Sequence, residues 1–392
     1  MNYYNIALIG SPLSEFTYHA EQEIAIGRCV TVQVKSRVVD GVVVQKCEKP
    51  DFSTNAIIEC SEHIFAQKQI ALAKFIASYY ICSLGDAFAI MTPFLDNITA
   101  LKSSVQTQKS KIQLSAKQNE ALLFLQQHKV ALLFGDTGSG KTEIYMKYFE
   151  KMVADGKTSI FLMPEISLTP QMSHRLKEHF GEDFVMWHSK LTPLAKKKAL
   201  AKIYAGEAKI IAGARSALFL PIKNLGVIVV DEEHDESYKS SSRPRYNARD
   251  LAIYMGKLYG VHVVLGSATP SLNSYVKFPH YRLKGGHFSS EKSFIYEKSA
   301  ENLSPLIVEN LQSVLAKKEQ AIVFLPTRAN FKYLLCQDCG HTFTCAFCSV
   351  GMSLHHHVRA MKCHYCNFTQ AIPQVCPECH STHLTSSRLG TA

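Results

Sequence analysis

Residues 131–142 have the sequence ALLFGDTGSGKT, in which a short apolar run leads directly into a GxxxxGK(S/T) phosphate-binding loop. We expect a strand at Ala131–Phe134 and a helix over Glu143–Val153, the local structure that such a loop requires. Glycines allow backbone N–H groups to turn toward phosphate oxygens, and the start of the helix adds positive potential. The sequence therefore predicts a nucleotide site formed by Gly135, Asp136, Thr137, Gly138, Ser139, Gly140, Lys141, Thr142 and Glu143.

The chain around this loop alternates short apolar runs with helical segments. The runs are rich in branched residues and nearly free of polar ones, as in strands that are buried on both faces. Strand–helix alternation of this kind predicts a parallel α/β sheet. The further runs lie at Ser159–Met163, Lys209–Ala212, Val227–Val230 and Val261–Leu265.

The run at Val227–Val230 ends in two carboxylates, Asp231 and Glu232. In a nucleotide hydrolase, one carboxylate at such a strand end holds Mg²⁺, and a second orients and deprotonates the attacking water. We therefore assign Asp231 to the metal, together with the Thr142 hydroxyl, and Glu232 to the water. Lys141 would reach the β- and γ-phosphates, so Lys141, Asp231 and Glu232 are the expected catalytic residues. An acidic strand end without a ligand is the structural alternative.

The segment GSATP at residues 266–270 follows the next buried strand. Small hydroxyl residues at the end of a strand can link a nucleotide site to a second ligand. We assign this coupling role to Ser267 and Thr269, and a simple turn is the alternative explanation of the motif.

Cations and aromatic rings alternate between Tyr238 and Asp250, directly after the acidic strand end. Cations suit phosphates and rings suit bases, so the segment has the composition of a contact with single-stranded nucleic acid. Its expected DNA-binding residues are Arg245, Tyr246 and Arg249. An ordinary charged loop is the alternative.

Eight of the twelve cysteines form four CxxC pairs near the end of the sequence. Eight thiolates fit two tetrahedral zinc sites, each closed by four cysteines and therefore structural. Three pairings can be drawn, and the gap between the second and third pairs is close to the ~15–20 residues of known CxxC…CxxC sites. We therefore expect nested sites, one formed by Cys345, Cys348, Cys363 and Cys366 and the other by Cys336, Cys339, Cys376 and Cys379. An iron–sulfur cluster is the rival interpretation.

The composition agrees with a globular protein that binds a polyanion. The 392 residues are 46% hydrophobic, which excludes a mainly disordered chain. The net charge of +10 favours a nucleic-acid partner without requiring one. No apolar run approaches the ~18 residues that span a bilayer. The first ten residues lack the pattern of a secretory signal, so we expect a cytoplasmic protein without membrane association.

Changes in composition along the chain predict several segments. The first contains paired strands within Cys29–Gln45, joined by a turn near Asp40-Gly41, and a helix over Ile70–Tyr80. Near the other end, a helix at Pro305–Ala316 and a strand at Ala321–Leu325 can begin a second α/β segment. The expected division is a β-rich domain at 1–95, a polar linker at 96–113, an α/β lobe at 114–295, the start of a second lobe at 303–334, the zinc region at 335–383 and a continuation of the second lobe at 384–392.

In combination these motifs resemble those of the superfamily 2 helicases, and more specifically of the bacterial primosomal replication-restart DNA helicases, the PriA (primosomal protein N′) family. The resemblance runs over nearly the whole chain in family order, and the eight-cysteine element is its most specific part. It implies RecA-like lobes that hydrolyse Mg-ATP and an N-terminal domain that receives the 3′ end of a nascent strand. It also implies two zinc ions with the nested pairing. The motifs that carry it are GDTGSGKTE at 135–143, PEISLTPQ at 164–171, GARSA at 213–217, DEEH at 231–234, RYNARD at 245–250 and GSATP at 266–270.

The resemblance adds residues that composition and spacing alone do not single out. Phe16-Thr17-Tyr18 is similar to the family's FDY, which implies that Phe16 and Tyr18 belong to the 3′-end pocket. Gln118 in LSAKQ resembles the glutamine that reads adenine, and Arg215 in GARSA resembles a strand-contacting arginine.

Several departures from the family pattern bear on these expectations. Thr17 replaces an aspartate, Lys35 stands where the family has a glycine, and Asn247 replaces a histidine. The linker leaves no room for the family's winged-helix domain. The sequence reaches Gly390 where the family continues through GTE into the remainder of the second lobe, which supplies an arginine to the ATP site. We therefore expect this chain to bind ATP and DNA without efficient hydrolysis.

The expected function is that of an ATP-dependent 3′-to-5′ DNA helicase, which recognises stalled or branched replication forks and initiates primosome assembly. Its expected ligands are ATP, Mg²⁺, two Zn²⁺ and branched or single-stranded DNA. Its expected partners are primosome proteins, the machinery that loads the replicative helicase, and single-stranded DNA-binding protein. The alternatives are another superfamily 2 translocase, for example one acting on RNA, and a non-catalytic fork-binding assembly module.

Overall fold

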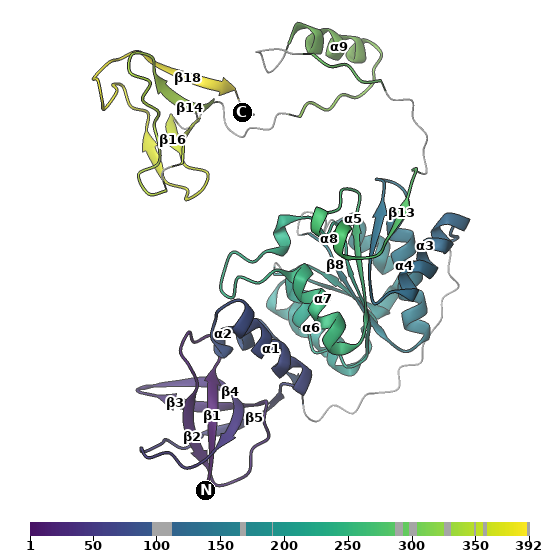
Figure 1. Ribbon diagram of the computed structural model, residues 1–392, viewed down its shortest axis with the longest axis vertical. Helices are drawn as coiled ribbons and strands as arrows, with labels where there is room; N and C mark the ends of the chain where they lie inside the picture. The colour runs from purple at the N-terminus through teal and green to yellow at the C-terminus, as the bar shows by residue number, and fades with distance from the viewer. Residues whose placement is uncertain are drawn as a thin grey trace. The chain divides into compact units, whose positions relative to one another are not determined.

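The computed structural model describes residues 1–95, 112–164, 170–189, 191–286, 293–297, 304–324, 331–348, 350–355 and 359–389. The chain divides into two compact units, Met1–Ser290 and Glu291–Ala392 (Figure 1). In the part of the chain that is described, no helix is both long and apolar enough to cross a membrane.

The first unit begins with an antiparallel sheet of six strands in the order β2-β1-β4-β3-β5-β6. The strands and the two helices that follow are β1 (Asn2–Leu8), β2 (Phe16–Ala20), β3 (Arg28–Val34), β4 (Arg37–Cys47), β5 (Glu59–Ile64), α1 (Gln67–Tyr79), α2 (Leu84–Ala89) and β6 (Phe94–Leu95). Helix α1 buries Ile70, Ala73 and Ile76, the spacing expected of one apolar helix face. The β-rich N-terminal region and the helix near residues 70–80 are therefore confirmed.

The turn expected at Asp40-Gly41 was wrong. The chain reverses at Lys35-Ser36, and Asp40 and Gly41 lie inside β4 opposite Thr31 and Val30. Gly41 is needed for packing and not for a turn, because a Cβ there would lie 2.4 Å from Ile6 Cγ2 of the neighbouring strand. Lys35 has a φ of 53°, in the region that favours glycine, which explains why a glycine suits this position.

The rest of the first unit is a parallel sheet of seven strands in the order β13-β7-β12-β11-β8-β10-β9, as the strand–helix alternation predicts. Short 3-10 helices lie at Gly181–Asp183, Arg215–Phe219 and Glu236–Tyr238. The other elements are α3 (Ala116–Gln127), β7 (Val130–Gly135), α4 (Lys141–Ala154), β8 (Thr158–Leu162), α5 (Pro170–Phe180), β9 (Phe184–Trp187), α6 (Pro193–Ala205), β10 (Ile210–Gly213), β11 (Leu225–Val230), α7 (Ala248–Tyr259), β12 (His262–Ser267), α8 (Leu272–Lys277) and β13 (His280–Leu283).

Helices cover both faces of this parallel sheet (Figure 1). Successive strand residues point to opposite faces, so Leu132 packs in the core that contains residues of α6 and α7, and Leu133 in the core that contains residues of α3 and α4. The unbroken apolar runs are explained by this burial on both sides. The carboxyl ends of the parallel strands consequently meet at one edge, where ligands bind in open α/β sheets.

The second unit contains helix α9 (Pro305–Ala316) and an antiparallel sheet in the order β17-β16-β15-β14-β18. Its strands are β14 (Phe331–Cys336), β15 (Ser353–His355), β16 (Ala360–Lys362), β17 (Thr369–Ala371) and β18 (Leu384–Leu389). The helix at 305–316 is confirmed. The strand expected at Ala321–Leu325 was wrong over 321–324, which have no regular structure and leave Ile322 97% exposed. Nearly all of the expected linker, 96–111, lies outside the described residues.

Candidate functional site

The phosphate-binding loop joins β7 to α4. Gly138 and Gly140 have φ values of 75° and 86°, in the left-handed region that glycine tolerates. The Lys141 ammonium donates a hydrogen bond to the carbonyl oxygen of Gly135 at 3.0 Å, and therefore lies over the loop. The Ser139 hydroxyl oxygen is buried and has no hydrogen-bond partner in the described part of the chain. A glycine backbone, an ammonium and an unused hydroxyl fit a bound phosphate group.

Gln118 lies against this loop. It forms a capping box with Ser115 at the start of α3, in which the Ser115 amide donates to Gln118 Oε1 at 2.8 Å. Gln118 Nε2 donates to the Ser139 carbonyl oxygen at 3.3 Å. A Cβ on Gly140 would lie 2.1 Å from the same nitrogen, so the contact depends on a glycine at that position. The expected adenine-reading residue therefore sits beside the phosphate loop.

Two carboxylates of the expected nucleotide site have partners elsewhere in the first unit. Asp136 accepts hydrogen bonds from Arg282 of β13 at 2.5 Å and from the Gly285 amide at 2.9 Å. The Arg282 hydrogen bond holds the pKa of Asp136 below its ordinary value. Glu143 forms an ion pair with Arg175 of α5. Both contacts hold the phosphate loop against neighbouring elements. A direct role for either carboxylate in nucleotide binding stays a prediction.

Asp231 and Glu232 directly follow β11. Asp231 Oδ1 accepts a hydrogen bond from the Tyr145 hydroxyl of α4 at 3.2 Å. Burial, with the negative charge of Glu232, raises the pKa of Asp231 to about 6, and the Lys141 charge acts in the opposite direction. The ammonium of the loop and this carboxylate therefore belong to one site. A divalent cation beside Asp231 would favour its ionised form, which suits the expected magnesium role.

The expected coupling residues contact the acidic segment through His234, which sequence reasoning did not single out. His234 Nδ1 lies 2.8 Å from Ser267 Oγ, and its Nε2 lies 3.4 Å from Thr269 Oγ1. The same ring lies 3.7 Å from Glu232 Oε2. The end of β12 is thus joined to the expected catalytic carboxylate by one imidazole.

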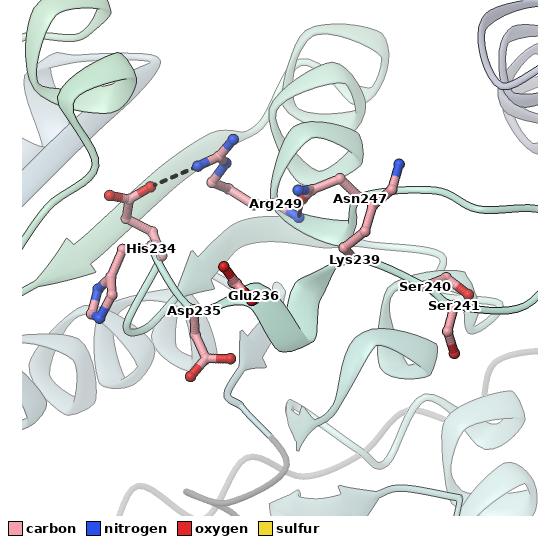
Figure 2. A pocket seen from close by; sticks show the side chains of 9 residues that line it. His234, Asp235, Glu236, Lys239, Ser240, Ser241, Asn247 and Arg249 are labelled. Carbon is pink, nitrogen blue, oxygen red and sulfur yellow. Dashed lines mark hydrogen bonds and ion pairs between the residues drawn. The ribbon is translucent and has the colours of Figure 1, made fainter. Parts of the chain in front are cut away.

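Glu233 is a second residue that sequence reasoning did not single out. Its side chain is fully buried and accepts hydrogen bonds from the Ser271 amide at 2.6 Å and from the Ser274 hydroxyl at 2.7 Å. Arg249 Nη1 donates to Glu233 Oε2 at 3.2 Å (Figure 2). Arg249 also pairs with Asp250 at 2.8 Å and is only 15% exposed, so this expected DNA contact is held by two carboxylates.

The acidic segment and the loop after it border a pocket of about 490 Å³ (Figure 2). The lining carries both signs of charge, since Glu233, Asp235 and Glu236 face a set that includes Lys239 and Arg249. The segment with alternating cations and rings therefore borders the same pocket as the DEEH motif.

The other expected DNA-contacting residues differ in their exposure. Arg245 is exposed and Phe16 is 37% exposed, whereas Tyr18 is 4% and Tyr246 is 6% exposed. The Arg215 guanidinium donates to a main-chain carbonyl oxygen of the loop, that of residue 239, at 2.6 Å. The two buried tyrosines act as core rings in this structure, so their rings are not open to a base here.

The cysteines form the two nested sets that the spacing predicts. In each set the four Sγ atoms lie within 4.8 Å of one another. Sγ–Sγ distances of 3.3–3.6 Å are too long for disulfides, which are ~2.05 Å, and approach those of thiolates around one tetrahedral ion. His355 and His364 contact each other, with Nε2 atoms 3.1 Å apart, and belong to neither set. The donor sets fit two structural zinc ions.

Comparisons with known proteins agree with this architecture. Family models match a PriA 3′ DNA-binding domain at residues 6–93, a DEAD/DEAH box helicase at 115–278 and the Cys-rich region of PriA DNA helicase at 345–370. The replication restart protein PriA of Helicobacter pylori is 44% identical over all of this chain and 63% of its own length. That of Bacillus subtilis is 41% identical over 68% of this chain and 35% of its own length. The chain thus spans about three fifths of the Helicobacter pylori relative, and it belongs to the family of the replication restart protein PriA.

Proposed function

We propose that the protein is an ATP-dependent 3′-to-5′ DNA helicase that recognises stalled or branched replication forks and initiates primosome assembly. The observation that carries the proposal is a series of contacts and charge interactions that leads from the phosphate loop to residues 238–250, which we call the cationic loop. The Lys141 charge favours the ionised form of Asp231. The His234 ring lies 3.7 Å from Glu232 Oε2 and 2.8 Å from Ser267 Oγ. Glu233 accepts a hydrogen bond from Arg249 of the cationic loop at 3.2 Å. A nucleotide site connected in this way to a nucleic-acid surface is what a translocating motor requires.

Each residue of the nucleotide site would have a separate role in hydrolysis. Lys141 would bind the β- and γ-phosphates, while Thr142 and Asp231 would hold Mg²⁺. Magnesium would neutralise charge that builds up on the phosphates. Glu232 would orient the attacking water and accept its proton. The Tyr145 hydroxyl donates a hydrogen bond to Asp231 Oδ1 at 3.2 Å, which would keep the carboxylate in one orientation for the metal.

The remaining parts would recognise the fork and its proteins. We propose that the N-terminal domain receives a 3′ DNA end near Phe16 and that Arg215 and Arg245 contact the strand. The two zinc sites would stabilise a surface on which other proteins dock. Its expected partners are primosome proteins, the machinery that loads the replicative helicase, and also single-stranded DNA-binding protein. A protein with this function would act on chromosomal DNA in the cytoplasm.

Competition between nucleic acids tests this proposal. Fluorescence anisotropy should show that the chain binds a model DNA fork more tightly than an RNA duplex of the same length and at the same salt concentration. Lys141→Ala should abolish binding of a fluorescent ATP analogue and leave fork binding intact, with Lys147→Ala on the same helix as the control. Tight preference for RNA would instead support a different translocase, and unchanged ATP binding by Lys141→Ala would remove the assigned site.

A further inference from the structure

Three nearly parallel aromatic rings join the N-terminal domain to the parallel-sheet lobe. Phe75 of α1 stacks on Tyr254 of α7, with ring centroids 3.6 Å apart and planes 9° apart. Tyr79, one helical turn after Phe75, stacks on it at 5.3 Å and 16°. We call Tyr254, Phe75 and Tyr79 the ring stack. Its two inner rings are partly buried, whereas Tyr79 is 65% exposed, so the stack ends in an open aromatic surface.

The cationic loop is fixed beside this open end. The Asn247 amide donates a hydrogen bond to the Tyr80 hydroxyl oxygen at 3.2 Å. The Lys239 ammonium lies 5.4 Å from the centroid of the Tyr80 ring, which itself contacts the Tyr79 ring edge-on at 4.9 Å. The Arg243 side chain is 60% exposed and lies 3.7 Å from Asp86 of α2. Lys239 therefore lies over the ring next to Tyr79, and Arg243 lies beside α2, the helix that follows α1. The position of Tyr79 itself is set by both domains through its stack on Phe75 and Tyr254.

Two acidic groups near this surface have basic partners. Asp86 is 12% exposed and lies beside Arg243, and Asp250 pairs with Arg249 at 2.8 Å. Two further carboxylates, Asp235 and Glu236, line the pocket that Lys239 borders, and the loop exposes Lys239 and Arg243 on the side of α1 and α2. An aromatic face with adjoining cations suits a nucleic-acid strand, since bases stack on rings in a way that tolerates any sequence, and phosphates pair with cations.

We infer that Tyr79, Lys239 and Arg243 form a contact site for single-stranded DNA at the junction of the two domains. A base would stack on Tyr79, and the neighbouring phosphates would meet Lys239 and Arg243. This inference rests on the proposed DNA-binding function and extends it to a helix end that neither the 3′-end pocket nor the helicase motifs include. The strand would thereby touch the N-terminal domain and the loop that borders the DEEH pocket at the same time.

Binding of a single strand whose 3′ end carries a phosphate tests the inference, because a blocked end removes the contribution of a 3′-end pocket. The probe is a fluorescein-labelled oligothymidylate of about 20 nucleotides, and its fluorescence anisotropy is measured with the 392-residue chain at several salt concentrations. Tyr79→Ala should raise Kd by about 5- to 100-fold, the effect of losing one stacked base. Tyr79→Phe keeps the ring and should bind as the unmodified chain does. Tyr296→Ala, which removes a 91% exposed tyrosine of the second unit, should also leave Kd unchanged.

The salt dependence of binding tests the two cations. Lys239→Gln and Arg243→Gln should each reduce the slope of log Kd against log salt by about 0.7, the value for one phosphate contact on a single strand. Photocrosslinking of the unmodified chain to an oligonucleotide with 5-iododeoxyuridine should label Tyr79, a readout that does not depend on the folding of any variant. If the unmodified chain binds no DNA, the proposed function fails as well. If it binds DNA while Tyr79→Ala keeps the same Kd and Tyr79 is not labelled, only the junction site is refuted.

Discussion

The buried carboxylate of Glu233 provides the sharpest test of the packing behind the site. Its side chain has no exposed surface, and it accepts four hydrogen bonds: two from Ser271, one from Ser274 and one from Arg249. Glu233→Ala would leave the guanidinium, itself only 15% exposed, without its buried counter-charge. Removal of one partner from a buried pair costs about 3–5 kcal/mol. Glu233→Gln keeps the volume and one oxygen, so we expect a smaller loss of about 1.5–3 kcal/mol, the worth of a hydrogen bond to a charged group.

The chain offers a local probe for this measurement. Trp187 is the only tryptophan and lies in β9 of the parallel sheet, so its fluorescence during urea unfolding reports on this lobe. Glu236→Ala is the matched control, because Glu236 is exposed on the same segment and should change the free energy of unfolding by less than about 0.5 kcal/mol. Arg249→Met combined with Glu233→Gln should cost less than the sum of the two single changes. A loss below about 1 kcal/mol for Glu233→Ala would refute the buried ion pair.

Three further predictions concern the carboxylate site and the zinc region. The pKa of Asp231 is raised to about 6, so its ionised form opposes folding above pH 6 and this cost disappears as the pH falls toward 4. Asp231→Asn should therefore stabilise the nucleotide-free lobe by up to about 3 kcal/mol at pH 8 and by almost nothing at pH 4, as measured by urea unfolding at both values. Gly266→Ala would place a Cβ 1.7 Å from the Tyr145 hydroxyl, and should weaken Mg²⁺-dependent binding of a fluorescent ATP analogue; unchanged affinity would contradict this packing. A zinc chelator should expose β14–β18 to limited proteolysis while Trp187 fluorescence stays constant, because bound zinc supplies the folding energy of such regions.

The sequence predicted the elements whose signals are local. The parallel strands and the phosphate loop could be predicted from residues that are neighbours in the sequence. The cysteine spacing alone favoured the nested pairing. The hairpin turn was misplaced because Asp40-Gly41 has the composition of a turn, whereas Gly41 is glycine to allow β1 to approach. The strand expected at 321–325 rested on hydrophobicity alone, and Phe324 is 83% exposed. An apolar run becomes a strand only where other strands pair with it.

The contacts that complete the site could not be predicted in this way. Arg249 lies in a segment with the composition of a DNA contact, and only the folded chain shows that Glu233 binds it. His234 was part of a known motif, but its contact with Ser267 joins segments 33 positions apart. Tyr246 was expected to contact a base because of its neighbours in sequence, yet its ring packs edge-on against Phe219 at 5.1 Å. The spacing of residues in the sequence identifies the side chains that a nucleotide or DNA site needs. Tertiary packing decides which of these side chains stay accessible to a ligand.

The nesting of the cysteine sets determines the order in which the C-terminal region can assemble during synthesis. All four inner ligands leave the ribosome before Cys376, when the outer site has only half of its thiolates. The inner site joins Cys348 to Cys363 across 15 positions, and the outer site must join Cys339 to Cys376 across 37. The cost of closing a loop grows with its free length, so the first ion shortens the loop that the second must close. Under zinc limitation, the chain would therefore accumulate as a half-loaded intermediate with the inner site filled.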